Sequence, residues 1–197
     1  EWCEEPSNFR CQGDLDAFLR DRGVPGLWGV DTRELTRIIR EYGEEKFAHS
    51  IAVHIEKYRQ DKEIETTMEL AEIIKSSMPA SARRNKNPAK KTFQAIRIAV
   101  NAELDALEEA LERAFRLLVP GGRMAIITFH SLEDRMVKQK YAEWCKGCIC
   151  PPDFPVCVCG RTPRAKLVSR KPILPSEEEL AKNNRSHSAK LRVCERI

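Results

Sequence analysis

The feature that most constrains this chain is a short apolar run that ends in a polar turn, RMAIITFHSLEDR, at Arg123–Arg135. It follows Pro120-Gly121-Gly122, which ends a long amphipathic helical pattern. The apolar run Met124–Phe129 predicts a buried strand. Ser131 and Asp134 have the spacing of a capping box, so a second helix is expected to begin there. Helix, strand, polar turn and helix in this order indicate an open α/β sheet, and such sheets bind ligands at the carboxyl ends of their strands.

Length and composition exclude several classes of protein. The chain has 197 residues, 42% of them hydrophobic and 32% charged, which indicates a soluble globular protein rather than a disordered one. Its apolar runs all fall short of the roughly 20 residues that cross a bilayer. The acidic start Glu1–Glu5 is unlike a secretory signal, so the expected location is the cytoplasm. Disulfides are rare in that compartment, and the eight cysteines therefore need another explanation.

Hydrophobic spacing predicts the other elements of the fold. A stripe that recurs every three or four residues from Ile96 to Leu118 predicts one long helix that begins at Thr92. Capping pairs predict helices that begin after Asp31 and after Thr66. Further helices are expected at 14–22, 44–59, 135–144 and 177–182, and a closing strand pair with an antiparallel edge at 166–174 and 189–197.

Two segments concentrate positive charge although the net charge is only +4. Arg83–Lys91 and Arg161–Lys171 each contain five basic residues and no acid. Such segments bind phosphates or are simply solvated loops, and charge alone favours neither. Gln94, Arg97 and Asn101 lie next to the first segment, on the following predicted helix. These polar groups would line a cleft or face water, and the basic loop beside them favours the cleft.

Five cysteines lie within 15 residues. A proline-rich turn at 151–155 would fold two Cys-x-Cys arms toward each other. Thiolates are soft ligands and four of them suit tetrahedral zinc, although structural zinc sites more often use Cys-x2-Cys arms. The alternatives are inert reduced cysteines and a redox role, and the latter lacks a thioredoxin-like pattern. The predicted ligands are Cys148, Cys150, Cys157 and Cys159.

The first 40 residues resemble one known family. CEEPSNFR at Cys3–Arg10 and GLWGVDTRELTR at Gly26–Arg37 are similar to the small, glutaminase-bearing chain of carbamoyl-phosphate synthase. In that family this stretch belongs to the N-terminal, non-catalytic domain. The family's glutaminase cysteine and histidine lie far downstream and are not expected in this chain. The resemblance fades near Arg40–Gly43.

From about Tyr42 onward the chain resembles the ribosomal RNA small subunit methyltransferase H family. The motifs are YGEEKFA at 42–48, TMELAEII at 67–74, KTFQAIRIAVNAEL at 91–104, PGGR at 120–123, FHSLEDR at 129–135 and N-x-RS-x-SAKLR at 183–192. The resemblance implies an enzyme that uses S-adenosylmethionine to methylate the N4 amine of one cytidine in small-subunit ribosomal RNA. It also implies a Rossmann-like sheet with an inserted helical domain. The expected partners are that RNA or the assembling 30S subunit, with neither DNA nor a membrane, and a homodimer is left open.

The resemblance also directs attention to particular residues. A cytosine amine needs polar groups that orient it and accept a proton as the methyl group transfers. The candidates are His130, Ser131, Glu133, Asp134 and Asn101. The alternative for Glu133 and Asp134 is ordinary negative charge at a helix start. RNA phosphates would be held by Arg83, Arg84, Lys86, Lys90, Lys91, Gln94 and Arg97.

The family's cofactor turn is not found in this sequence. That turn is glycine-rich and follows a strand so that the backbone can approach the cofactor, whereas Gly121-Gly122 precedes a strand. We therefore predict a partial Rossmann-like α/β methyltransferase that is inactive alone, formed by a fusion or a gene-assembly artefact with its joint within Ile38–Gly43. The expected domains are 1–40, helical 41–91, and 92–197 with a cysteine-rich loop at 145–160. The alternatives are a non-enzymatic RNA-binding or zinc-stabilised fragment, and a piece of carbamoyl-phosphate synthase.

Overall fold

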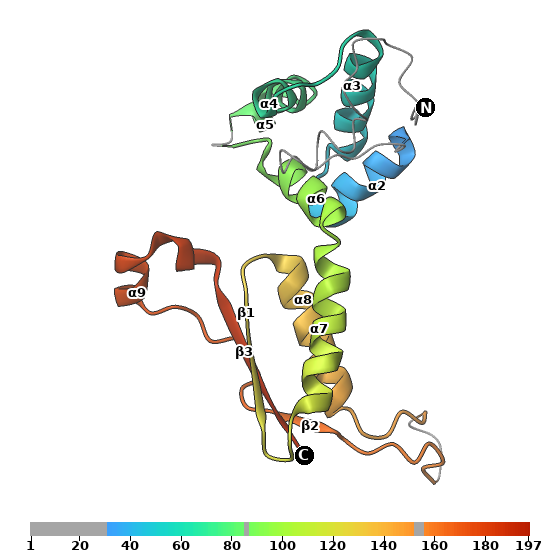
Figure 1. Cartoon of the computed structure of the whole chain (residues 1–197), viewed down its shortest axis with the longest axis vertical. Coiled ribbons are helices and arrows are strands. Elements are labelled where there is room, and N and C mark those ends of the chain that lie inside the picture. The colour runs from blue at the N-terminus through green and yellow to red at the C-terminus, as the bar shows by residue number, and fades with distance from the viewer. Residues whose placement is uncertain (1–30, 85–86, 152–155) are drawn as a thin grey trace, which may run out of the picture. The chain divides into compact units, whose positions relative to one another are not determined.

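The computed structural model describes residues 31–84, 87–151 and 156–197. The chain divides into two compact units, Glu1–Glu103 and Leu104–Ile197, and each is described by itself (Figure 1). The helix predicted at 14–22 lies outside the described residues. Within the described ranges, every helix is too short or too polar to span a bilayer.

The first unit is helical. Its core is built from the apolar faces of three helices, with Leu35 and Ile39 from the first, Ile51 and Ile55 from the second, and Ile74 from the third. Two predicted helix starts are confirmed, because Asp31 accepts the Glu34 N–H at 2.7 Å and Thr66 forms a capping box with Glu69. The helices are α2 (Thr32–Gly43), α3 (Ala48–Asp61), α4 (Thr67–Ser76), α5 (Ala80–Arg83) and α6 (Lys90–Val100). The helix predicted from residue 44 thus begins four residues later.

Helix α2 runs without a break across the predicted joint at Ile38–Gly43. Its C-terminal end lies close to α6, since a Cβ atom at Gly43 would be 2.8 Å from the carbonyl oxygen of Lys91. Glu44 then takes a left-handed conformation, with φ 48°, which ends the helix. A glycine at position 43 is therefore needed for close packing rather than for an unusual backbone angle.

The single long helix predicted from Thr92 to Leu118 is wrong. The chain forms α6 and then α7 (Glu103–Leu117), separated by Asn101 and Ala102. Ala102 has φ 47°, and a left-handed residue cannot continue a right-handed helix. Only the second part of the predicted stripe enters a core, with Leu111 and Phe115 buried in the second unit. Helix α6 instead buries Thr92, Ala95 and Ile98 and leaves Ile96 and Val100 half-buried.

The second unit contains an antiparallel sheet of three strands in the order β1-β3-β2. The strands are β1 (Arg123–Thr128), β2 (Ala165–Leu167) and β3 (Lys190–Arg196). Strand β1 and the antiparallel closing pair agree with prediction, but the strand expected at 166–174 shrinks to β2 and one bridge between Ile173 and Leu191. Helix α9 (Glu177–Lys182) lies where it was predicted, and the polar loop after it is the 3-10 helix η1 (Asn184–Ser188). The described chain thus has a mixed α/β fold.

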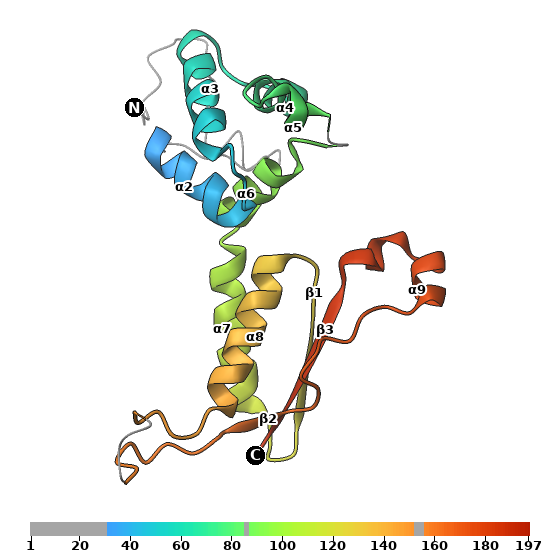
Figure 2. The ribbon, with the colours of Figure 1, turned by 180° about the vertical axis from the view of Figure 1, so that it is seen from behind.

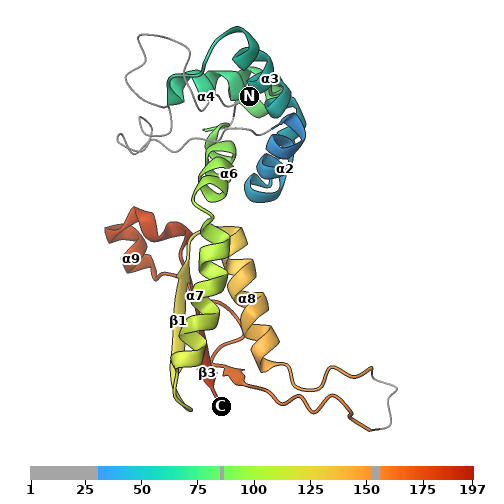
Figure 3. The ribbon, with the colours of Figure 1, turned by 45° about the vertical axis from the view of Figure 1, so that its right-hand side comes forward.

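Helices α7 and α8 (Ser131–Cys145) run side by side along one face of the sheet (Figure 2; Figure 3). The core between them contains Phe115 and Trp144, whose rings stack at 4.0 Å, and Tyr141, whose hydroxyl donates to the Met124 carbonyl at 3.2 Å. The other face of β1 is open, because Ile127 is 59% exposed. The strand is therefore buried on one face only, as is common in antiparallel sheets.

Candidate functional site

The candidate site is the turn between β1 and α8. His130 is the N-cap of α8, and its Nδ1 accepts the Glu133 N–H at 3.3 Å. In return, Glu133 Oε2 accepts the N–H groups of Phe129 at 2.9 Å and His130 at 3.2 Å. The capping box therefore begins one residue before the predicted Ser131. Imidazole is a rare cap, but it serves here because Nδ1 supplies the acceptor that a first-turn amide needs.

The same contacts fix the imidazole ring. Since Nδ1 accepts a hydrogen bond, the neutral ring carries its proton on Nε2. Nε2 is buried and lies 3.2 Å from Glu133 Oε1, but this contact lacks hydrogen-bond geometry. Among the described residues, Nε2 has no hydrogen-bond partner. His130 and Glu133 thus hold the helix start and each other.

Asp134 links the start of α8 to strand β3. Its carboxylate accepts the Arg192 Nε at 2.7 Å and Nη2 at 3.1 Å, and Lys190 Nζ lies 3.5 Å away. The Asp134 and Arg192 side chains are each only 12% exposed. The hydrogen bonds from Arg192 lower the pKa of Asp134 and outweigh desolvation, which raises it. This is a two-pronged, charge-assisted contact of the strong kind.

Arg192 and Lys190 were not predicted as partners of the site. The available signal was charge within an apolar strand pattern, because Arg192 interrupts the run that continues to Cys194. A cation at such a position needs an anion nearby, and the acidic turn was the obvious source.

The predicted site residues fall into two groups. His130, Ser131, Glu133 and Asp134 lie together within the first turn of α8, where Ser131 is exposed. Asn101 belongs to the other unit, where it ends α6 and its side-chain amide donates to Glu103 at 3.3 Å. Phe129, which was not predicted as a site residue, is 56% exposed at the end of β1.

Three of the six basic residues predicted to bind RNA have partners within the first unit. Arg83 donates to the carbonyl oxygens of Met78 at 2.7 Å and Ser76 at 2.9 Å. Lys91 donates to the Glu44 carbonyl at 3.0 Å, and Arg97 pairs with Glu103 at 2.8 Å.

The remaining members of that set are more exposed. Arg84 and Lys90 are exposed, and neither forms an ion pair within the described ranges. Gln94 donates to the Tyr42 carbonyl at 3.5 Å, and Lys86 lies outside the described residues. The predicted basic loop is also shorter than expected, because Arg83 belongs to α5 and Lys90 belongs to α6.

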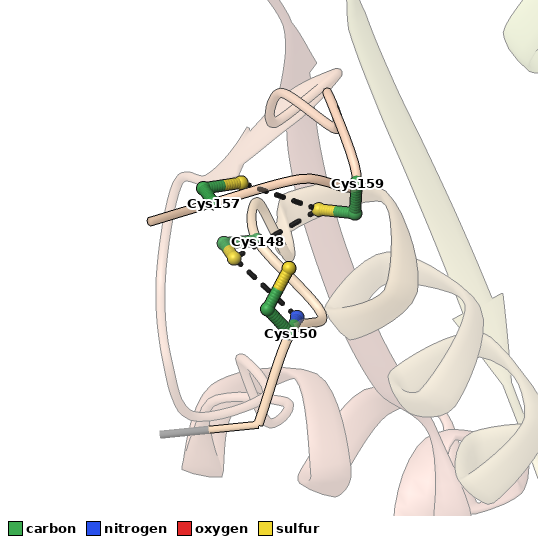
Figure 4. Close-up of side chains that lie close together, drawn as sticks. All are labelled: Cys148, Cys150, Cys157 and Cys159. Carbon is green, nitrogen blue, oxygen red and sulfur yellow. Dashed lines mark hydrogen bonds between the residues drawn. The ribbon is translucent and has the colours of Figure 1, made fainter. Parts of the chain in front are cut away.

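The structure gathers the four predicted metal ligands. The thiol sulfur atoms of Cys148, Cys150, Cys157 and Cys159 all lie within 4.8 Å of one another, and Figure 4 shows them turned to a common space. The fifth cysteine, Cys145, ends α8 and packs against the core of the second unit instead.

Two families match this chain. Residues 27–197 match the model of the MraW methylase family, and residues 1–48 match the model of the carbamoyl-phosphate synthase small chain, CPSase domain. The two matches overlap at 27–48, the region that contains α2. Both resemblances seen in the sequence are thereby confirmed.

Relatives from the methylase family align with most of this chain. The ribosomal RNA small subunit methyltransferase H of Paenibacillus sp. (strain JDR-2) is 58% identical over 185 residues, which are 93% of this chain and 58% of the relative. The protein of the same name from Symbiobacterium thermophilum is 58% identical over 168 residues, which are 85% of this chain and 53% of the relative. This chain thus spans a little over half the length of these relatives. With a family model matched across residues 27–197, it belongs to the MraW methylase family.

Proposed function

We propose that this chain is the substrate-side part of an enzyme that transfers a methyl group from S-adenosylmethionine to the N4 amine of a cytidine in small-subunit ribosomal RNA. The observation that carries the proposal is the match of residues 27–197 to a methylase family whose relatives are named as methyltransferases of small-subunit ribosomal RNA. On this view residues 41–91 are the inserted helical domain and residues 92–197 are the second half of a Rossmann-like sheet. The expected location remains the cytoplasm.

We assign two roles to the side chains in the turn after β1, namely support of the helix start and contact with the RNA base. His130, Glu133 and Asp134 hold the start of α8 through the capping box and the pair with Arg192. Ser131 and the ring of Phe129 are the exposed groups at the same turn. An exposed aromatic ring stacks on an unpaired base, and a hydroxyl hydrogen-bonds to its edge. We therefore propose that Phe129 and Ser131 contact the cytosine. Asn101, which belongs to the other unit, remains a proposed catalytic residue.

The described residues do not fit S-adenosylmethionine. Among them, β1 is the strand that leads directly into a helix, and Phe129 and His130 follow it instead of glycine. A side chain in that turn prevents the close approach of backbone to cofactor that glycine permits. We propose that the donor is held by a part of the family fold that this chain does not supply, and that the chain alone is inactive.

RNA phosphates would bind the cations that have no partner inside the first unit. Arg84 and Lys90 meet that description within the described residues, and Lys86 lies between them in the sequence. Arg83, Lys91, Gln94 and Arg97 remain proposed contacts, although each already bonds within the protein.

The test is a split-enzyme experiment. This chain is mixed with the part of the Paenibacillus relative that it does not cover, and tritium transfer from S-adenosylmethionine to small ribosomal subunits is followed by nucleoside analysis. We expect N4-methylcytidine only when both polypeptides are present. Methyl transfer by this chain alone, or micromolar binding of S-adenosylmethionine to it in calorimetry, would overturn the claim that the donor site is absent. A mixture in which both polypeptides bind subunits without producing N4-methylcytidine would reject the proposed function.

RNA binding is measured separately with the chain alone. Replacing Arg84 and Lys90 with Gln should weaken binding to a decoding-region RNA and reduce the slope of log K against log salt by about two. The matched control replaces the exposed Lys57 and Lys138 with Gln, which removes the same charge elsewhere. Equal losses in both pairs would mean that only net charge matters. RNA binding without methyl transfer in any mixture would favour the alternative of a non-enzymatic RNA-binding fragment.

A further inference from the structure

We propose that Cys148, Cys150, Cys157 and Cys159 bind one zinc ion in a closed tetrathiolate site. The cysteines follow the C-terminal end of α8, whereas the turn proposed to contact the cytosine lies at its N-terminal end, so this inference is independent of the proposed function. The four side chains come from two short arms in the connection between α8 and β2 (Figure 4).

The spacing of the sulfur atoms fits a tetrahedral metal centre. With a zinc–sulfur bond of about 2.3 Å, the corners of a tetrahedron lie about 3.8 Å apart. The Sγ atoms of Cys157 and Cys159 are 3.5 Å apart, and those of Cys159 and Cys148 are 3.8 Å apart. The largest separation in the cluster stays within 4.8 Å, so only small rotations about the side-chain bonds are needed to close the site.

The two arms are held together at their bases. The Arg164 N–H donates to the Trp144 carbonyl at 2.8 Å, and the Ile197 N–H donates to the Arg164 carbonyl at 3.0 Å. One step farther along the two arms, a Cβ atom at Gly147 would lie 3.3 Å from the Pro163 ring. These contacts hold the arms close through groups other than the four cysteine side chains, which lowers the ordering cost of forming the site.

Backbone amides support the sulfur atoms. The Cys150 N–H donates to Cys148 Sγ at 3.4 Å. The backbone amides of Ile149 and Arg161 likewise hydrogen-bond to Cys159. Metal sites use such outer contacts to orient their ligands and to stabilise the thiolate form.

The four thiolate ligands determine which class of metal the site would bind and whether that metal would be structural or catalytic. Four soft thiolates in a tetrahedron suit zinc or an iron–sulfur centre, and not magnesium or calcium, which prefer oxygen. All four coordination positions would be filled by protein, which is the mark of a structural zinc site rather than a catalytic one. The ion would tie Cys148–Cys150 to Cys157–Cys159.

The experiment uses the full chain, purified in reductant with zinc and then dialysed. Metal analysis should give one zinc per chain, and cobalt added to the metal-free protein should show the visible bands of a tetrahedral cobalt–thiolate centre. The double variant Cys157→Ser, Cys159→Ser should bind zinc at least about 10-fold more weakly. The matched control is Cys145→Ser, which removes a neighbouring thiol outside the cluster and should leave zinc binding unchanged.

Several results would overturn the proposal. Zinc content of the wild-type chain no higher than that of the double variant, together with absent cobalt–thiolate bands, would show that the cysteines are inert. Iron retained in preference to zinc would replace the metal assignment. If the double variant does not fold, the metal content and cobalt spectrum of the wild-type chain decide the question. No readout depends on methyl transfer, so failure here leaves the proposed function untouched.

Discussion

Asp134→Asn should weaken the second unit strongly, because it removes the anion that neutralises Arg192. The carboxylate accepts two hydrogen bonds from Arg192, at 2.7 and 3.1 Å, between side chains that are each 12% exposed. Breaking a buried ion pair by removing one partner costs about 3–5 kcal/mol, and hydrogen bonds to charged groups contribute about 1.5–3 kcal/mol each. Asn keeps the shape and one acceptor, and some solvent remains, so we expect a loss of about 2–4 kcal/mol.

The assay is urea unfolding followed by the fluorescence of Trp144, which stacks on Phe115 in the core of the second unit. Trp2 and Trp28 are replaced with Phe so that the signal reports this core alone. The control is Arg123→Gln, which breaks a cross-strand pair with Glu195 whose Arg123 side chain is 63% exposed. An exposed pair of this kind contributes less than about 1 kcal/mol. A loss in Asp134→Asn no larger than in the control would refute the reasoning.

The effect of Asp134→Asn should also depend on pH. Arg192 lowers the pKa of Asp134 in the folded state below the ordinary value of 3.8. The carboxylate therefore contributes its stability above the unfolded pKa and loses it as pH falls through the folded pKa. We expect the difference in unfolding free energy between wild type and variant to be largest at neutral pH and to shrink below about pH 4. The same difference at pH 7 and at pH 3 would contradict this account.

Two further substitutions exchange glycine and alanine with opposite expected signs. Gly43→Ala places a methyl group 2.8 Å from the Lys91 carbonyl oxygen, a backbone atom, and should destabilise the first unit by about 1–3 kcal/mol in thermal unfolding followed by circular dichroism; an unchanged melting temperature would mean that α2 and α6 are less closely packed. Ala102→Gly relieves a left-handed alanine and should stabilise the chain by up to about 1 kcal/mol, and a clear loss of stability would count against the helix break.

Much of the fold could be predicted because its elements follow local rules. The helical spacing of Ile51 and Ile55, the capping box of Thr66 with Glu69, and the apolar run of β1 each depend on residues within a few positions of one another. The helix α9 and the final strand are identified by the same local patterns. Such signals need no knowledge of distant parts of the chain.

The features that were missed depend on distant contacts or on unusual local chemistry. Neither glycine nor proline marks the break at Asn101–Ala102, and the stripe stays in helical phase through it, although only its second part, from Leu107 on, packs in a core. The pair of Asp134 with Arg192 joins residues 58 positions apart, a separation at which spacing carries no information. Histidine is not one of the residue types that usually cap helices. The sequence therefore favoured Ser131 as the N-cap, which is wrong, because His130 caps the helix.

The candidate site stays a prediction from the sequence, and the contacts of its side chains required the structure. The position at the end of β1 follows from strand and helix patterns, whereas the hydrogen bonds and burial of each side chain depend on the folded chain. Glu133 and Asp134 already satisfy the helix start and Arg192, which strengthens the structural alternative for both. Phe129, which is exposed at the same turn, was not predicted as a site residue because it ends an apolar run in the sequence.

Helix α2 explains how two unrelated family patterns can meet in one folded unit. Leu35, from the part that resembles carbamoyl-phosphate synthase, and Ile39, inside the predicted joint, enter the same core. To pack in that core, α2 needs only an apolar face at helical spacing and a small residue at position 43, where α6 lies close. Both family matches include residues 27–48, so α2 lies within both of them. A joint inside a helix whose two halves obey one packing rule leaves the core intact, whereas a joint that shifted the helical phase by one residue would turn Leu35 toward solvent.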